Sequence, residues 1–195
     1  MNQSFKKDLY RYYGDRKRTI MDRIFMPEEL HYIYYMRMTR DARWRILKYY
    51  YHIRLRMIQD KTQIQIPYYA EIGDGFYIGH CGRIIISPNA KIGKNVNVGT
   101  GVTIGEENRG KKRGAPIISE NVWIGTNAVV VGNIIIDTDV LIAPLAYVNF
   151  DVPSHSIVIG NPGEIISRGG RQKNILQIWL TKKINDKGQF GKGNL

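Results

Sequence analysis

The sequence is poor in cysteine and contains no long hydrophobic run. Cys81 is the only cysteine among 195 residues, so an internal disulfide is excluded and a reducing compartment is expected. No N-terminal stretch has the apolar run of a signal peptide, and no apolar run approaches the ~20 residues that a membrane-spanning helix requires. These absences predict a cytoplasmic location.

Acidic residues are also scarce. The chain has 17 Asp and Glu against 29 Lys and Arg, which gives a formal net charge of +12. Residues 1–65 contribute most of this excess, with 15 Lys and Arg against 7 Asp and Glu. A basic balance is typical of proteins that bind nucleic acid, an anionic membrane surface or a phosphorylated ligand. Because no nucleic-acid-binding motif is present, we expect one of the other two partners.

The common metal-binding and catalytic motifs are missing. There is no CxxC or HExxH spacing, and only His80 and His155 of the four histidines lie in or beside the repeat described below. We therefore expect no catalytic metal. The sequence also lacks GxSxG, a Walker loop and GxGxxG between a strand and a helix, which excludes the reaction classes that depend on them. For His31 and His52 we expect a packing or surface role, and for His155 a hydrogen bond within a turn.

What the sequence does contain is a six-residue period. A period of six fits neither an α-helix nor an alternating strand, and it is typical of the hexapeptide β-helix. Each unit is expected to form one short strand and one turn, with its aliphatic side chain packed against those of the coils above and below. Glycine and asparagine are expected where the turns need φ > 0. The aliphatic series comprises Ile66, Ile72, Ile78, Ile86, Ile92, Val98, Ile104, Ile118, Ile124, Val130, Ile136, Ile142 and Val148.

Two interruptions of this period lead to the functional prediction. The first is an eight-residue step after Ile78, and it contains His80. The second is a fourteen-residue step after Ile104, from which the charged stretch 106–115 must leave the coil. Insertions in a solenoid form loops on one face, often the binding face. We interpret His80 as a candidate catalytic residue, whereas the cations of 106–115 either bind an anionic ligand or are simply solvated.

The segment before the repeat is predicted to be helical. The stretch from Pro27 to about Met57 opens with Pro27, Glu28 and Glu29, which is typical of a helix N-terminus, and continues with aromatic residues at helical spacing among Arg and Lys. Such a segment can cap the open N-terminal end of the coil or pack against a neighbouring subunit. It can also lie as a basic amphipathic helix on an anionic membrane surface, and these roles are compatible.

These patterns predict three parts: an N-terminal helical segment over 1–65, a mainly β domain of hexapeptide repeats over 66–168, and a C-terminal tail over 169–195. The tail is Gly- and Lys-rich, and we expect it to be poorly ordered. A closing strand pair is expected at the end of the repeat, around Val158, Ile159, Ile165 and Ile166.

The combination of motifs resembles the hexapeptide-repeat acetyltransferases over roughly residues 64–168. The nearest branch is the serine acetyltransferase-like one, which includes capsular and other sugar O-acetyltransferases. The resemblance implies a left-handed parallel β-helix, a homotrimer with active sites between subunits, and acetyl-CoA as the acetyl donor. It rests on the Ile78-Gly79-His80 turn followed by Gly82 and Ile84-Ile85-Ile86, the excursion at 106–115, and Gly160-Asn161-Pro162-Gly163.

The resemblance also assigns roles to individual residues. His80 matches the catalytic histidine, which acts as a general base that takes the proton of the acceptor hydroxyl as its oxygen attacks the thioester; an imidazole suits this task near neutral pH. The backbone at Gly125-Thr126 and Ala143-Pro144 matches positions that line the pantetheine arm of CoA. Arg168 fits a position where a basic group meets the CoA phosphates, and a solvated surface charge is the alternative.

Three positions depart from the pattern of serine acetyltransferases proper. Ala115 precedes Pro116 where those enzymes have a second active-site histidine, and Gly79 and Gln65 replace two aspartates. The N-terminal helical part is also shorter than theirs. We therefore expect a sugar hydroxyl on a polysaccharide or its precursor as the acceptor, with Gln65 as a neutral group that could orient His80. Serine O-acetyltransferase is the alternative activity, and a non-catalytic hexapeptide scaffold is the alternative of another class.

Overall fold

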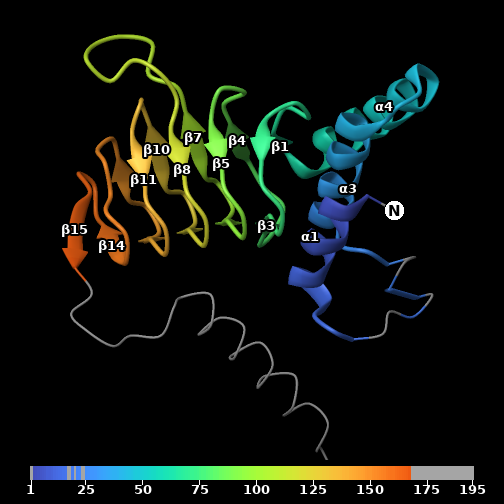
Figure 1. Ribbon diagram of the computed structural model, residues 1–195, viewed down its shortest axis with the longest axis horizontal. Helices are drawn as coiled ribbons and strands as arrows, with labels where there is room; N and C mark the ends of the chain where they lie inside the picture. The colour runs from blue at the N-terminus through green and yellow to red at the C-terminus, as the bar shows by residue number, and fades with distance from the viewer. Residues whose placement is uncertain (1, 17–18, 20, 23–24, 168–195) are drawn as a thin grey trace, which may run out of the picture.

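The computed structural model describes residues 2–16, 19, 21–22 and 25–167. Arg168 and the expected tail 169–195 lie outside the described residues. The described part begins with three helices, α1 (Gln3–Tyr13), α3 (Glu28–Asp41) and α4 (Arg45–Thr62), and continues as a succession of short strands (Figure 1).

The strands form three sheets because the chain returns to the same face at every third strand. The first sheet contains β1 (Ile64–Gln65), β4 (Ile84–Ile86), β7 (Thr103–Gly105), β10 (Val129–Val131) and β13 (Tyr147–Val148). The second contains β2 (Glu71–Ile72), β5 (Lys91–Ile92), β8 (Ile117–Ile118) and β11 (Ile135–Ile136). The third contains β3 (Tyr77–Ile78), β6 (Asn97–Val98), β9 (Trp123–Ile124), β12 (Leu141–Ile142), β14 (Ser156–Ile159) and β15 (Glu164–Ser167).

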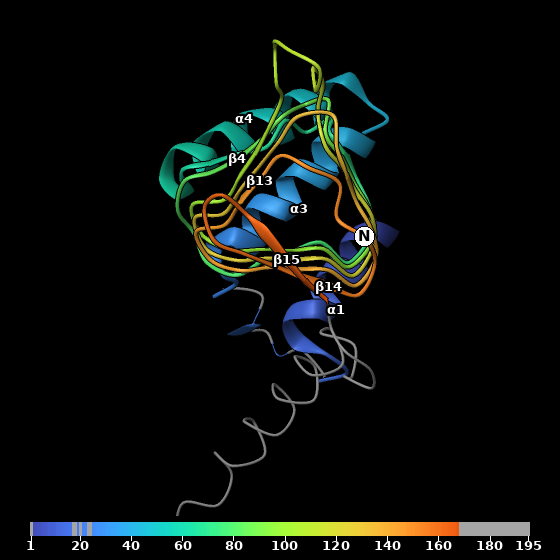
Figure 2. The ribbon, with the colours of Figure 1, turned by 90° about the vertical axis from the view of Figure 1, so that its left-hand side faces the viewer.

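The fold is a left-handed parallel β-helix, as predicted, preceded by a helical segment. Viewed along the axis, successive coils lie almost on top of one another (Figure 2). The pairing is parallel throughout the coils, and only the final pair, β14 and β15, is antiparallel, with Val158 opposite Ile165. The expected closing strand pair is thereby confirmed.

The core of the coil follows the six-residue period. All thirteen aliphatics of the predicted series are buried, none more than 6% exposed. A second buried series, which the sequence analysis did not identify, falls two positions before each aliphatic and varies in size from alanine to phenylalanine. It includes Ala70, Phe76, Ala90, Val96, Val102, Val122, Ala128, Ile134, Val140 and Ala146.

The turns use asparagine and glycine for different reasons. Asn95 and Asn121 adopt φ of 57° and 60°, and the amide of Asn95 donates to Asn121 Oδ1 of the next coil at 3.2 Å. Gly73 does not have a positive φ, but a Cβ at Gly73 would lie 2.6 Å from the backbone of Gly93. The expectation that glycine serves positive φ is therefore wrong for Gly73, where glycine allows two coils to approach closely.

The predicted helix over 27–57 is two helices. α3 ends at Asp41, Ala42 is extended with φ −63° and ψ 118°, and α4 begins at Arg45 and continues to Thr62. Within the helical segment predicted over 1–65, the chain also forms α1, whose bounds the sequence did not indicate, and the side chain of Asn2 caps it by accepting from the backbone N–H of Ser4 at 2.7 Å.

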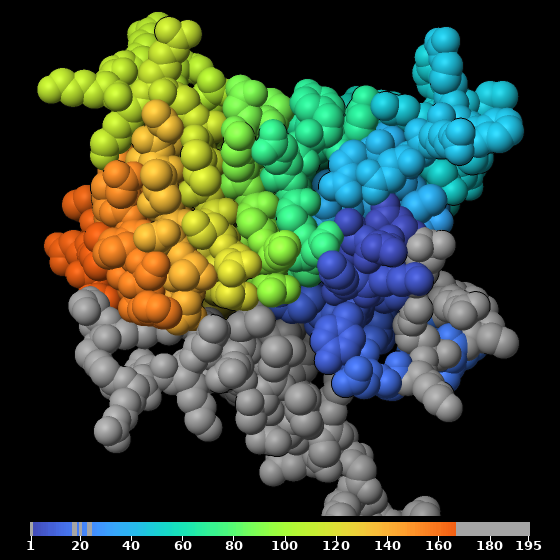
Figure 3. All heavy atoms as spheres, in the orientation of Figure 1, coloured from blue at the N-terminus to red at the C-terminus, as the bar shows by residue number. Residues whose placement is uncertain are grey.

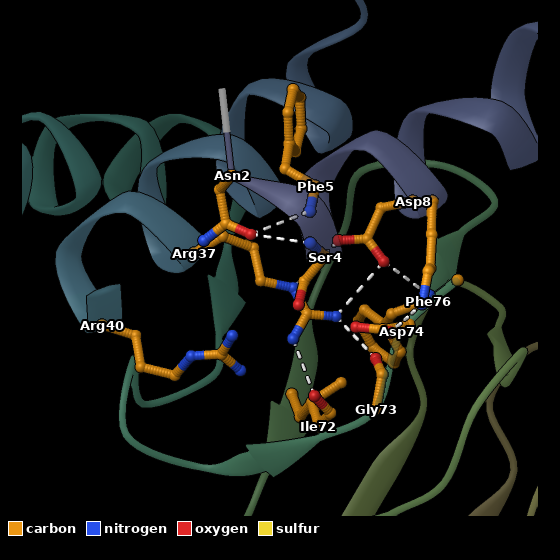
Figure 4. Close-up of polar contacts among 12 residues, drawn as sticks. Asn2, Ser4, Phe5, Asp8, Arg37, Arg40, Ile72, Gly73, Asp74 and Phe76 are labelled. Carbon is orange, nitrogen blue, oxygen red and sulfur yellow. Dashed lines mark hydrogen bonds and ion pairs between the residues drawn. The ribbon is translucent and has the colours of Figure 1, made fainter. Parts of the chain in front are cut away.

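Helices α1 and α3 close the N-terminal end of the coil by satisfying its unpaired backbone groups. Arg37 of α3 donates to the carbonyls of Ile72 and Gly73 at 2.7 and 2.6 Å, and it forms a buried ion pair with Asp8 at 2.9 Å (Figure 4). Asp8 in turn accepts from the backbone N–H of Phe76 at 2.8 Å. Without these partners, the first coil would present a bare strand edge.

Two tyrosine hydroxyls complete the same cap. The Tyr32 hydroxyl donates to the Ile66 carbonyl at 2.8 Å and accepts from the Ile66 N–H at 2.9 Å. The Tyr12 hydroxyl does the same for Ile78, at 2.7 and 3.0 Å. The prediction that the N-terminal segment caps the coil is thus confirmed for α1 and α3.

Candidate functional site

His80 lies in the turn between β3 and β4, where the six-residue period is first broken. Gly82 permits this turn, because it has a φ of 137° and a Cβ there would lie 2.4 Å from Cγ2 of Thr100. The Gly82 N–H donates to the Thr62 carbonyl at 3.0 Å, which ties the turn to the end of α4. The His80 side chain is exposed on the outside of the coil.

A cavity of about 240 Å³ brings His80 together with Gly125, Thr126 and Pro144. These residues come from three different coils, and they are four of the six residues that the sequence analysis singled out. Ala143 does not line the cavity, but its carbonyl carbon would lie 2.9 Å from a Cβ at Gly125. Ala143-Pro144 therefore packs directly against the backbone of Gly125, and glycine is required there. Arg168 lies outside the described residues.

The structure adds Asn97, which the sequence analysis missed. Asn97 lines the cavity between Tyr77 and Trp123, its register partners on the neighbouring strands. It is only 4% exposed, and its Oδ1 accepts from Arg11 of α1 at 2.7 Å. A guanidinium has no acceptor atom, so this contact fixes which branch of the carboxamide is oxygen. The other branch, with the two hydrogens of Nδ2, is thereby held in a defined orientation at the cavity wall.

Cys81 follows His80, but it is a poor nucleophile. Burial raises the pKa of Cys81 to about 12, and the neighbouring carboxylate of Glu29 adds to this effect. The Cys81 thiol donates to Glu29 Oε2 at 3.3 Å. Because the thiolate is the reactive form, a covalent acetyl-cysteine route at this position is disfavoured at neutral pH. Burial also raises the pKa of Tyr77, so its phenol stays protonated.

Carboxylates are missing from the cavity wall as the structure describes it: none of the residues that line it is Asp or Glu. Gln65, considered as a neutral group that orients His80, lines a different cavity with His52 and Tyr68. That expectation is therefore wrong within a single chain. Among the described residues, no cluster of three or more His, Cys, Asp or Glu side chains is placed to hold a metal ion.

The excursion 106–115 is a hairpin that projects from the coil (Figure 1). Glu107 and Gly114 exchange two backbone hydrogen bonds of 2.9 Å at its base. The Lys112 ammonium donates to the Asn149 carbonyl, whereas Arg109 and Arg113 are exposed. No residue of this hairpin lines the His80 cavity of the same chain.

His155 has a structural role, but its side-chain contact crosses to the preceding coil and does not stay within the turn as was expected. It adopts φ of 59° in the turn before β14, and its Nδ1 lies 2.8 Å from the carboxylate of Asp139. The two residues belong to consecutive coils, so this contact joins the last turns of the solenoid.

No family model matches the sequence. Among curated proteins, it is similar to the serine acetyltransferase of Staphylococcus xylosus, with 41% identity over 113 residues, 57% of this chain and 51% of that protein. The serine acetyltransferase of Bacillus pumilus is 35% identical over 113 residues, 58% of this chain and 52% of that protein. The chain thus spans about half the length of the curated relatives that it matches.

Solved structures show the same similarity over more of the chain. A serine acetyltransferase from Brucella abortus matches with a TM-score of 0.70 at 25% identity, over 86% of this chain and 69% of that one. A Neisseria gonorrhoeae serine acetyltransferase in complex with serine matches with 0.67 at 26% identity, over 85% and 68%. The chain is therefore similar in sequence to serine acetyltransferases over more than half of its length, and it has their left-handed parallel β-helix fold.

Proposed function

We propose that this protein is an O-acetyltransferase that moves an acetyl group from acetyl-CoA to a hydroxyl, with His80 as general base. The observation that carries the proposal is the cavity that holds His80 beside Gly125, Thr126 and Pro144. It occurs in a chain whose curated relatives are named serine acetyltransferases. The donor follows from that similarity, and no metal is needed for the reaction.

The chemistry requires one base and one hydrogen-bond donor. His80 takes the proton of the acceptor hydroxyl while the oxygen attacks the thioester carbonyl. The new C–O bond forms, the C–S bond then breaks, and the proton passes from the imidazolium to the departing CoA sulfur. The negative charge that develops on the carbonyl oxygen needs a fixed donor. The Asn97 amide is our candidate, because Arg11 holds its orientation before any ligand binds.

Serine is the acceptor that the comparisons favour. Each of the curated relatives described above is named a serine acetyltransferase, and one structural relative was solved with serine bound. Our expectation of a sugar acceptor receives no support from these comparisons. We therefore propose serine O-acetyltransferase as the first activity to test.

A sugar hydroxyl is the second candidate, and one observation favours it. The cavity wall of a single chain has no described Asp or Glu that could pair with the ammonium group of serine. A neutral acceptor needs no such counter-charge. We propose that the protein is a homotrimer, in which the hairpin 106–115 of a neighbouring subunit completes the site. Ala115 of that hairpin supplies no histidine.

The test is acetyl-CoA turnover of the full chain with serine and, separately, with a panel of sugars and nucleotide sugars. We expect His80→Ala to lower kcat by about 100-fold or more, the usual contribution of a general base, with unchanged folding. The matched control is His52→Ala, which removes a half-buried histidine of α4 outside the cavity. Unchanged turnover in folded His80→Ala would overturn the mechanism. Calorimetry that detects no CoA binding by the wild type would instead favour a non-catalytic scaffold.

A further inference from the structure

The outer face of α4 is an apolar ridge left uncovered by the residues that the structure describes. The ridge consists of Ile46, Tyr50, Ile53 and Met57, which are 80%, 52%, 60% and 60% exposed. Their spacing of four, three and four residues places them in one line along a helix. The opposite side of α4 carries its buried residues, including Leu55. The helix therefore packs on the protein with one face and presents a second apolar face to the outside.

Cations border the ridge on both sides. α4 contains five Lys and Arg and a single acid, Asp60. At 100° per residue, Arg54 lies on one side of the ridge, and Arg45 and Arg56 on the other. Neither Arg45 nor Arg56 forms an ion pair with any residue that the structure describes, whereas Arg54 lies over the Tyr35 ring. The ridge thus combines apolar side chains with uncompensated positive charge.

The position of α4 makes this face accessible. The end of the α3–α4 pair projects from the end of the molecule opposite β15 (Figure 1), and the same cyan region protrudes in the space-filling view (Figure 3). Trp44 and Tyr49, next to the ridge, are 69% and 63% exposed. Aromatic residues of this kind are enriched where a protein meets the boundary of lipid and water.

We propose that the ridge of α4 docks this protein on an anionic membrane surface. Interfacial helices combine a line of large apolar residues with Lys and Arg around it, and anionic lipid headgroups attract such cations. A second copy of α4 fits less well, because paired ridges would bring arginines of both copies together with one acid each. No helix in the described part of the chain is long and apolar enough to cross a bilayer, so α4 lies on the surface. The inference does not depend on acetyl transfer.

The experiment is co-sedimentation of the full chain with vesicles of pure phosphatidylcholine or of phosphatidylcholine with phosphatidylglycerol. We expect binding to the anionic vesicles alone. Raising the salt from about 0.05 M to about 0.5 M should weaken it several-fold, because the added ions screen the headgroup charge.

Two variants separate the apolar and the charged contributions. Replacing two ridge residues, Ile46→Ser and Ile53→Ser, should lower the bound fraction about tenfold, because half of the apolar contact is lost. The double change Arg45→Gln and Arg56→Gln should weaken binding and flatten its salt dependence. Ile135→Ser is the matched control, since it removes an isoleucine of similar exposure, 50%, from the coil, and it should bind like the wild type.

Two results would overturn the proposal. One is no sedimentation with anionic vesicles at low salt by a protein whose circular dichroism shows it to be folded. The other is equal binding by the ridge variant and the wild type. Loss of concentration-dependent self-association in the ridge variant, without any vesicle binding by the wild type, would assign the ridge to a second copy instead.

Discussion

Helices α3 and α4 are neighbours in the chain with similar composition, yet they meet opposite environments. α3 buries a cation and a polar residue together with its apolar side chains, whereas α4 leaves six large apolar or aromatic residues exposed, including the four of the ridge. Arg37 is 1% exposed on α3, and Ile46 is 80% exposed on α4. Hydrophobicity alone would have predicted an exposed Arg37 and a buried Ile46.

The backbone of the first coil explains the difference. The exposed strand edge at either end of a solenoid has N–H and C=O groups without partners. A purely apolar helix packed on that edge would leave these groups unpaired. α3 therefore needs Arg37 and Tyr32 to reach those groups. α4 packs mainly on α3 rather than on the strand edge, so its polar residues are free to remain in solvent. Burial of α3 is thus set by hydrogen bonding as much as by apolar area.

The strongest way to break this arrangement is Arg37→Met. The substitution leaves Asp8 as a buried carboxylate without its partner and removes donors from Ile72 and Gly73. We expect a loss of about 3–5 kcal/mol in the free energy of unfolding, the usual cost of removing one partner of a buried pair. Denaturant unfolding followed by circular dichroism measures it.

Arg40→Met is the control for this change. Arg40 lies on the same helix but pairs with Asp41 in a partly exposed contact, so we expect a change below about 1 kcal/mol. Similar losses for both variants would mean that the removal of any charge destabilises α3, and that the buried Arg37–Asp8 pair contributes no more to stability than the partly exposed pair.

The cost of Arg37→Met should also depend on pH. Burial raises the pKa of Asp8 above its usual value of 3.8, while Arg37 opposes the rise. Without Arg37 the pKa of Asp8 in the folded state moves higher still, so the folded variant binds its proton more tightly than the unfolded chain does. A raised folded pKa gives stability that is present at low pH and lost as the pH rises through that pKa. The penalty at about pH 5 should therefore be smaller than at about pH 7.

The second prediction compares one isoleucine on each helix. Ile33 of α3 is fully buried, and Ile53 of α4 is 60% exposed. We expect Ile33→Ala to cost about 2–5 kcal/mol because it leaves a cavity, and Ile53→Ala to change stability by less than about 0.5 kcal/mol. Thermal or denaturant unfolding of both variants tests this. A large loss for Ile53→Ala would show that the ridge is already covered in the isolated protein.

The coil was predictable because its period is strict. Apart from its two interruptions, every sixth position is aliphatic across a series of thirteen residues, and each of these residues is buried. The second buried series escaped notice because it varies from Ala90 to Phe76, so no single residue type marks it. The break between α3 and α4 escaped for a related reason: residues 42–44 contain neither glycine nor proline, so no residue type marks the end of the helix.

The candidate site was predictable in part. His80 stands out because it interrupts a regular pattern, and its neighbours in the cavity followed from a family resemblance. Asn97 could not be found in this way, because its place depends on register with Trp123 and on Arg11, which lies 86 residues earlier in the chain. Within a single chain Gln65 does not reach His80, because β1 and β3 belong to different sheets of the same coil and their residues line different cavities.

The third and smallest predicted effect concerns a contact of α3 with the turn of His80. Glu29 accepts a hydrogen bond from Cys81, and the pKa of that thiol is raised to about 12 chiefly by burial and secondly by Glu29. Native Cys81 should therefore react with iodoacetamide far more slowly than a free cysteine, whose pKa is about 8.5.

Glu29→Gln removes the charge but not the burial, so the rate at about pH 9 should rise only a few-fold. Asp60→Asn removes the single acid of α4, which has no contact with Cys81, and should leave the rate unchanged. Equal acceleration by both variants would mean that overall charge controls the thiol; acceleration by Glu29→Gln alone would show that the charge of Glu29 acts on the thiol and that of Asp60 does not.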